Sequence, residues 1–373
     1  MSSQPQVDFS SLPDLRDTHP GSSLVQAFYL ECQVPAPFDH HDSSHTALMD
    51  NSVSVFVCAL RILYTHLSLK WRGDASAADE ELRREIRDVE EVTNPLLRFA
   101  WSRFPPGRQG ILAQSAALEA ISKQLLQGDF GITDLSFLSL AESPLMYQTL
   151  FKREAFQLYS PNPLSQPMRE GHGEDKDWDI DDGRRDVPGM AESSLITWDG
   201  LGDLGDFISS KFGIFEYAPT KMRYLWTSNN PAIIRVHYHA PASEPPRFAR
   251  LRRISVDGKC LHHEAGTVNS ATIASPEKGS LHYMIVAVIR LRMRAGEKEL
   301  IRRYSLNGSE IIAPIDYPYS HAEWKLGEPG RQYMLFYAEA PMYGTGLLLP
   351  EVAYRPAMAE ENMRIAYEAV NKP

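Results

Sequence analysis

Apolar residues in the last third of the chain recur in short runs that are typical of β-strands. Residues 284–291 form an apolar run rich in Ile and Val, residues 300–306 alternate apolar and basic side chains, and residues 333–337 are mostly aromatic. Clusters of Gly, Pro and Asn separate the runs at residues 294–296, 307–308 and 327–330. Such clusters reverse a chain between neighbouring strands, so the pattern predicts an antiparallel sheet.

The first half of the chain shows helical spacing instead. Apolar residues recur every three or four positions from Val53 to Leu67, and Asp50, Asn51 and Ser52 are N-cap candidates. Similar patterns predict helices over residues 77–91, 115–126 and 201–212, and strands over residues 221–226 and 232–238. Because helices and strands are segregated along the chain, we expect an α+β fold, with helices of residues 52–156 packed on an antiparallel sheet of residues 221–340.

Two polar stretches divide the chain into regions. Residues 1–22 are rich in Ser, Pro and Asp, and residues 160–192 combine prolines and glycines with a dense acidic run. Such segments bury too little apolar surface to offset their conformational entropy. We therefore predict a disordered N-terminus (1–22), a helical subdomain (23–159), an acidic disordered insertion (160–192), a β-rich subdomain (193–341) and a C-terminal tail (342–373).

Composition narrows the classes of partner and of site. The 373 residues carry a net charge of −10, which argues against a general nucleic-acid binder, so no nucleic-acid partner is expected. No apolar segment is long enough to predict a membrane span, and no signal peptide is recognised. The three cysteines have no paired spacing, which excludes a zinc ribbon and fits an intracellular protein, cytoplasmic or nuclear. We predict no cofactor and no metal site, and the oligomeric state stays open.

Three segments carry a resemblance to a known family. Residues 231–238 (PAIIRVHY), residues 281–291 and the closing strand YMLFY (333–337), in this order after a helix that opens behind Asn51 and Ser52, are similar to the ubiquitin-specific protease domain. The resemblance covers about residues 49–340 and implies a papain-like cysteine-protease fold of the deubiquitinase type. It also implies ubiquitin, or a ubiquitin-like protein, as a partner. The family's zinc-binding fingers insertion is expected to be absent, because its four cysteines are missing.

The chain departs from this family at its catalytic positions. Val53 occupies the position of the nucleophilic cysteine, while Arg302 and Arg303 occupy the region of the catalytic histidine. Valine cannot attack a carbonyl, and a guanidinium cannot accept a proton at physiological pH. Cys58 is the fallback nucleophile, but on a helix it lies about 140° around the axis from Val53.

Two functions follow as alternatives. The first is a catalytically inactive, ubiquitin-specific-protease-like protein that serves as a protein-binding module, with Asn51, Ser52 and Tyr304 as candidate binding residues. The second is an active thiol hydrolase, such as a deubiquitinase, with a displaced nucleophile at Cys58 or Cys32. A scaffold subunit with neither property also fits the sequence.

Overall fold

The structure is a computed structural model, and part of the chain is described in it. The described residues are 12–14, 45–70, 93–102, 104, 107–160, 164–168, 179–180, 187–246, 248–258, 260–263, 271–274, 281–304 and 324–340. The predicted helix over residues 77–91, the predicted turn at residues 307–308 and the predicted tail at 342–373 lie outside them. Within the described residues no helix is both long and apolar enough to cross a membrane.

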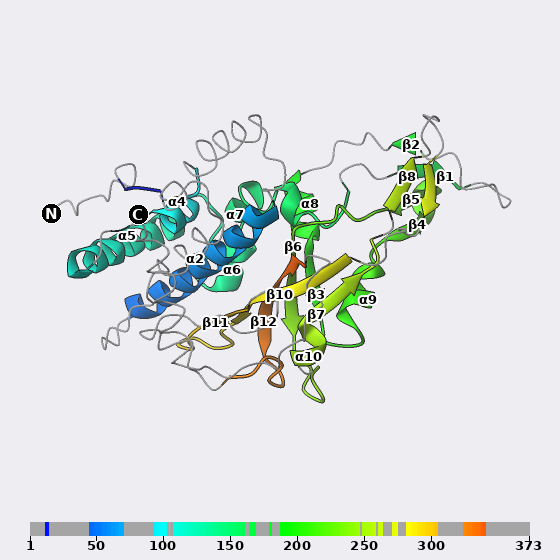
Figure 1. The fold of residues 1–373 in the computed structure, drawn as a ribbon. Coiled ribbons are helices and arrows are strands. Elements are labelled where there is room, and N and C mark those ends of the chain that lie inside the picture. Colours follow the sequence, from blue (N-terminus) through cyan, green and yellow to red (C-terminus); the bar gives the residue numbers. More distant parts are fainter. Residues whose placement is uncertain are drawn as a thin grey trace, which may run out of the picture.

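Helices form one layer of the fold (Figure 1). The central helix is α2, from His45 to Lys70, and its residues 52–63 are all buried. A helix that is apolar on all sides belongs inside a core, and α2 packs against α4, α5, α6 and the sheet. The other helices of this layer are α4 (Pro95–Trp101), α5 (Gly107–Gln127), α6 (Phe137–Ala141) and α7 (Pro144–Gln148). The predicted helix over residues 115–126 is thus confirmed as part of α5.

The start of α2 corrects the sequence-based prediction. The helix begins at His45, more than two turns before Val53, so Ser52 lies within the helix and does not cap it. The cap motif does occur at α4, where the Asn94 side chain accepts hydrogen bonds from the backbone N–H of Leu96 and Leu97. An Asn or Ser before an apolar run therefore marks the start of α4 correctly, but it does not mark the start of α2.

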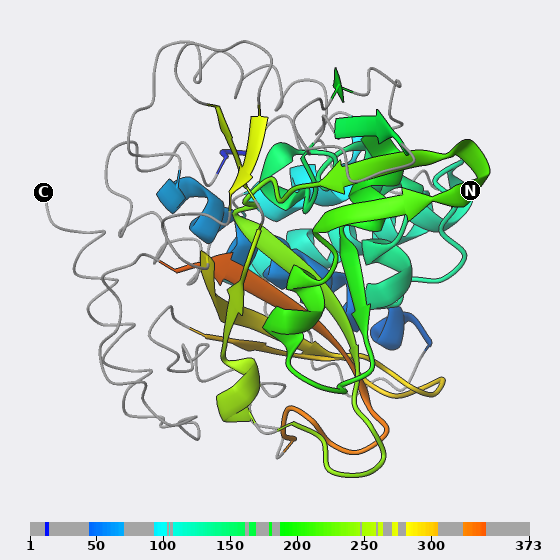
Figure 2. The same cartoon turned by 90° about the vertical axis from the view of Figure 1, so that its right-hand side faces the viewer.

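The second layer is a six-stranded sheet with the order β11-β10-β12-β6-β3, in which β7 also pairs with β10 (Figure 2). Its strands are β3 (Leu195–Trp198), β6 (Ile233–His239), β7 (Arg253–Val256), β10 (Leu281–Arg290), β11 (Leu300–Arg303) and β12 (Gln332–Glu339). All pairs are antiparallel except β3 with β6, which is parallel. The α+β class is confirmed, and the expectation of a purely antiparallel sheet is corrected at this one pair. A long crossover through other elements joins these two strands, as a parallel pair requires.

The sheet separates two apolar clusters because side chains alternate along each strand. On β12, Met334, Phe336 and Ala338 face the helices, while Tyr333, Leu335 and Tyr337 belong to the opposite cluster. The helix-side cluster joins residues from before position 160 with residues from after position 193. The helices α9 (Leu204–Ser209) and α10 (Phe248–Leu251) pack on the opposite side. Helix α9 corresponds to the helix predicted over residues 201–212.

A smaller four-stranded antiparallel sheet lies beside this body, at the upper right in Figure 1. Its order is β2-β1-β5-β4, built from β1 (Leu164–Pro167), β2 (Asp179–Ile180), β4 (Gly213–Tyr217) and β5 (Met222–Trp226). The 3-10 helix η3 (Ala218–Thr220) connects β4 to β5, while the helix α8 (Val187–Ser193) contacts β3 and the 3-10 helix η2 (Glu154–Phe156) contacts β6 of the main sheet. The remaining strands, β8 (Cys260–His263) and β9 (Ala271–Ala274), form a hairpin.

This small sheet corrects part of the predicted disorder. Residues 164–167 of the acidic segment pair with β5, and residues 187–192 lie in α8. Leu164 is buried opposite Leu225, so the segment orders on apolar surface that other strands supply. Near the N-terminus, Leu12 likewise packs against the helix-side cluster, and Asp14 bridges to Ser102. The boundaries between the proposed subdomains stay predictions.

Candidate functional site

The structure places the predicted nucleophile position inside the core. Val53 is 0% exposed and belongs to the helix-side cluster, and it lies in the interior of α2. A reactive thiol needs a helix N-terminus or a cationic neighbour and access for a substrate. The residue at this position has neither a helix terminus nor exposed surface.

Arg302 does not face Val53, because the two residues lie on opposite sides of β11. The Arg302 guanidinium lies over the Trp324 ring, 4.3 Å from its centroid, and donates to the Trp324 carbonyl at 2.7 Å. Trp324 belongs to the cluster on the far side of the sheet from α2. By alternation Arg303 is on the same side as α2, where burial lowers the pKa of its side chain.

Glu299 is an acidic residue that meets α2, and sequence reasoning did not single it out. Its carboxylate accepts a hydrogen bond from the backbone N–H of Phe137 at 2.8 Å and interacts with the hydroxyl of Ser52. Burial raises the pKa of Glu299, although these two hydrogen bonds act to lower it. Glu299 therefore ties α2 and the start of α6 to the strand β11. Ile301 packs on the helix-side cluster, and residues two positions apart on a strand share a face. This alternation could have placed Glu299 on the same side of the sheet.

Stability should report the state of Glu299. A carboxyl group whose pKa is raised in the folded state contributes stability that is full below its unfolded pKa and is lost as pH rises through the folded value. We expect Glu299→Gln, which keeps an oxygen for the Phe137 N–H, to remove this component. The difference in unfolding free energy, wild type minus variant, should fall as pH rises from 5 to 8 in urea titrations.

Glu297→Gln provides the matched control. Burial acts to raise the pKa of Glu297, but a hydrogen bond from the Met293 N–H and its pairing with Arg331 and Arg290 outweigh it, and the pKa is lowered. The ionised carboxylate of Glu297 should therefore stabilise the folded state, and this stabilisation should be lost as pH falls. Parallel pH profiles of the two variants would contradict the role assigned to Glu299.

The other candidate residues are also mostly buried. Cys58 is buried within α2. Tyr304 is fully buried, and its ring stacks on Phe248 with centroids 5.0 Å apart. Ser52 and Tyr304 are both buried in the core, and the binding roles predicted for them stay predictions. The side chain of Asn51 lies outside the described part of the chain, so its role stays a prediction.

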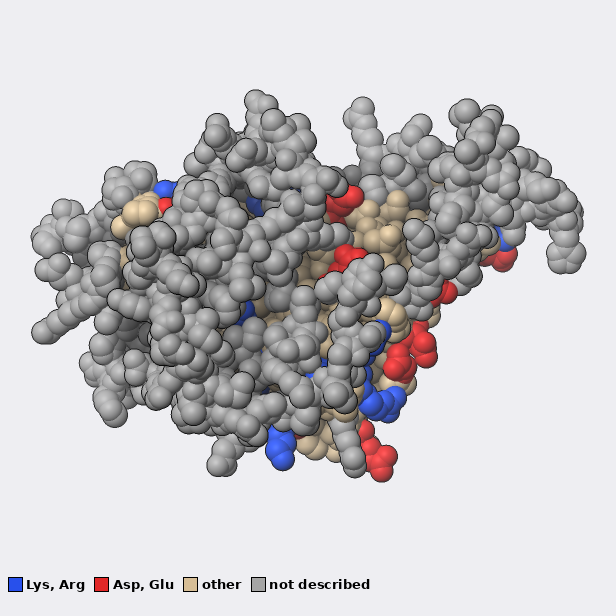
Figure 3. Space-filling view, in the orientation of Figure 1, with Lys and Arg blue, Asp and Glu red and all other residues tan. Residues whose placement is uncertain are grey.

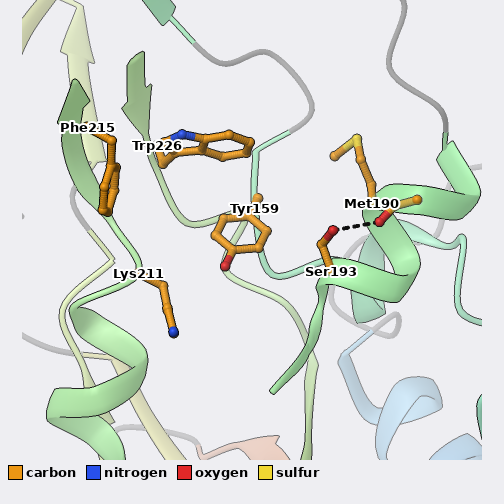
Figure 4. Close-up of a pocket in the computed structure, with 7 residues that line it drawn as sticks. Tyr159, Met190, Ser193, Lys211, Phe215 and Trp226 are labelled. Carbon is orange, nitrogen blue, oxygen red and sulfur yellow. Dashed lines mark hydrogen bonds between the residues drawn. The ribbon is translucent and has the colours of Figure 1, made fainter. Parts of the chain in front are cut away.

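A pocket of about 590 Å³ opens between α8 and the small sheet (Figure 4). Its walls are mostly apolar and aromatic, and its lining comprises Tyr159, Gly189, Met190, Ser193, Lys211, Phe215 and Trp226. The ring of Tyr159 packs edge-to-face on Phe212 and Trp226, with centroids 5.8 Å and 5.2 Å apart, which fixes its place at the centre of the pocket. Ser193 donates its hydroxyl proton to the carbonyl of Gly189 at 2.7 Å, within α8.

One face of the small sheet is aromatic and continuous with this pocket. Directly paired residues of antiparallel strands share a face, and the pairs are Gly213 with Trp226, Phe215 with Tyr224, and Tyr217 with Met222. Phe215 and Tyr217 are 43% and 54% exposed. We call Met222, Tyr224, Trp226, Phe215 and Tyr217 the aromatic face. Because large exposed apolar side chains are gathered here, the face has the character of a contact surface.

Charge does not gather into one patch on the side of the molecule seen in Figure 3. There, basic and acidic side chains of the described residues are interspersed. Several arginines of the strands are held in ion pairs, among them Arg290 with Glu297 at 3.4 Å and with Glu328 at 3.6 Å. Among the described residues, no group of three His, Cys, Asp or Glu side chains is placed to hold a metal ion.

Comparison with known proteins gives two weak structural similarities. No family model matches the chain, and no curated protein matches it. One similar solved structure is the Saccharomyces cerevisiae apo Pan2 pseudoubiquitin hydrolase-RNA exonuclease module in complex with AAUUAA RNA, with 10% identity and a TM-score of 0.23, covering 94% of this chain and 57% of that chain. The same module in complex with AACCAA RNA has 11% identity and a TM-score of 0.24, covering 94% and 58%.

The chain thus spans less than two thirds of the length of the structures it resembles. At these TM-scores the similarity does not define a shared fold, and the α+β class rests on the chain's own helices and strands. One expectation is corrected here. Nucleic acid was excluded as a partner on the basis of net charge, but both similar structures are complexes with RNA, so that exclusion is withdrawn.

Proposed function

We propose that this chain is a non-catalytic module of the ubiquitin-specific-protease type, papain-like in fold, which binds a protein partner through the aromatic face of its small sheet. The observation that carries the binding role is the exposure of Phe215 and Tyr217 on that face. Aromatic residues are the side chains most often found at the energetic centre of protein interfaces. Ubiquitin is the first partner to test, because the resemblance of the sequence implies it.

The absence of catalysis is supported by the surroundings of the central helix. A covalent mechanism needs a nucleophile and a base within hydrogen-bond reach, and losing the nucleophile removes nearly all the acceleration. Val53 is buried in the interior of α2, and Arg302 is engaged with Trp324 on the other side of β11. Cys58, the nucleophile of the alternative active hydrolase, is buried in the same helix, which argues against that alternative.

The test combines a binding assay with a covalent probe. We expect the purified chain to bind immobilised ubiquitin reversibly and to form no adduct with ubiquitin that carries a C-terminal electrophile. The double variant Phe215→Ser and Tyr217→Ser should weaken binding at least tenfold, because two exposed aromatic contacts are lost together. Surface plasmon resonance measures the affinity, and gel electrophoresis detects the adduct.

Leu201→Ser is the matched control, since Leu201 is also a large exposed apolar residue but belongs to the loop between β3 and α9 and not to the strands of the aromatic face. This variant should bind as the wild type does. An adduct that disappears in Cys58→Ala would establish the hydrolase instead. No ubiquitin binding would remove ubiquitin as the partner, and equal binding by the double variant would overturn the role of the aromatic face.

A further inference from the structure

The pocket beside α8 has the size and lining of a small-molecule site. Its volume of about 590 Å³ lies within the usual range of roughly 300–1,000 Å³ for ligand pockets. Figure 4 shows Phe215 and Trp226 on one side, Met190 on the other and Tyr159 between them, so an apolar group entering the pocket would contact aromatic rings and a thioether. Pockets of this kind select ligands by a few polar groups set among apolar walls.

Two polar groups, on Tyr159 and Lys211, lie toward one end of the pocket, while the Ser193 hydroxyl lies on the α8 side and is engaged with the Gly189 carbonyl. The Tyr159 hydroxyl and the Lys211 ammonium point toward the same region in Figure 4. Burial raises the pKa of Tyr159, so its hydroxyl stays protonated at neutral pH and can donate a hydrogen bond. The Lys211 ammonium lies 4.4 Å from the centroid of the Phe207 ring, which holds it at this position.

These donors define the charge of the ligand. Among the described lining residues Lys211 carries the formal charge, and none is Asp or Glu. Three aromatic rings could by themselves attract a cation, but the ammonium of Lys211 at the same pocket repels one. An anionic group would instead receive a charge-assisted hydrogen bond from Lys211 and a second hydrogen bond from Tyr159.

We propose that this pocket binds a small amphipathic carboxylate, with its apolar group against Met190 and the aromatic rings and its carboxylate at Lys211 and Tyr159. This is a site for a small molecule and is separate from the protein-binding role proposed above. Phe215 and Trp226 belong both to the aromatic face and to the pocket. Lys211 and Tyr159 line the pocket but are not part of the aromatic face.

Three probes with one hydrocarbon skeleton test the proposal. Isothermal titration calorimetry of the full chain with 4-phenylbutyrate should show saturable binding. We expect 4-phenylbutanol to bind at least about tenfold more weakly, since it lacks the charge-assisted hydrogen bond, and 4-phenylbutylamine to bind more weakly still. The fold must be intact in each variant, which circular dichroism checks.

Lys211→Met keeps the length of the side chain and removes its charge, so it should lower the affinity for 4-phenylbutyrate to that for the alcohol. Tyr159→Phe should lower it by a few fold. Lys221→Met, at an exposed lysine before β5 and outside the pocket, should leave it unchanged.

Equal binding of acid and alcohol by the wild type would overturn the proposal. So would an affinity for the acid that Lys211→Met does not change, or the lack of saturable binding by any probe at millimolar concentration. If Lys211→Met does not fold, the comparison of acid, alcohol and amine on the wild type still decides. Failure here leaves the ubiquitin assay unaffected, because that assay depends on Phe215 and Tyr217 and uses no small ligand.

Discussion

Replacing Phe336 by alanine should lower the free energy of unfolding by about 3–5 kcal/mol, the usual cost of emptying a large buried aromatic site. Phe336 is 1% exposed and lies on β12 with its ring directed at the helix layer, where it packs on Phe137 at a centroid distance of 6.3 Å. Its removal leaves a void between the sheet and the helices and so weakens the contact that holds these two layers together. Urea unfolding followed by tryptophan fluorescence measures the loss.

Phe215→Ala is the matched control for this change. The same side chain is removed, but from the exposed aromatic face, where it is 43% exposed. We expect a loss of stability below about 1 kcal/mol, since surface substitutions away from the core cost little. Equal destabilisation by the two variants would mean that the small sheet, and not the contact between helices and main sheet, determines stability.

The second large effect is expected at Arg235, a buried cation on β6. Its guanidinium donates to the Ala191 carbonyl at 2.5 Å and lies 3.9 Å from the centroid of the Phe151 ring. Burial lowers the pKa of Arg235 to about 10, so it stays charged at neutral pH. We expect Arg235→Ala to cost about 3–5 kcal/mol, because the packing on Phe151 is lost and the Ala191 carbonyl loses a donor inside the core.

Arg223→Ala is the control for the loss of an arginine. Arg223 lies on the small sheet with its side chain partly exposed, 3.9 Å from Glu216, and a pair of this kind contributes at most about 1 kcal/mol. Thermal unfolding followed by circular dichroism compares the two. If Arg235→Ala were as mild as Arg223→Ala, Arg235 would be tolerated in the core without stabilising it.

Local patterns predicted the elements well where a single period governs burial. The strands β6, β10 and β12 were predicted from their apolar runs, and helices α5 and α9 from their spacing and end signals. The start of α2 was missed because Ser52 carries a local cap signal, whereas the helix begins at His45 and its tertiary contacts stabilise the longer form. In the structure Ser52 interacts with Glu299, a partner almost 250 positions away that no local window contains.

The candidate site was harder to predict for the same reason. The alternation in residues 213–217 and 222–226 was present in the sequence, but which face is covered depends on which strands pair and on what packs behind them. The pocket needs Tyr159, α8 and the end of α9 to meet, and these come from three separate segments. The assignment of Val53 to the position of the nucleophile relied on a resemblance, and in the structure that residue packs inside the helix-side cluster.

The place of β12 in the sheet has a consequence for how the nascent chain folds. β12 lies between β10 and β6, and it pairs with β6 across a sequence separation of about a hundred residues, as between Ile233 and Ala338. Until this strand has left the ribosome, β3 with β6 and β7 with β10 and β11 can form only as separate pieces, each with an open edge. Synthesis proceeds at roughly 5–20 residues per second, so these edges are open to other chains for several seconds, and this interval is when a chaperone would have most to protect.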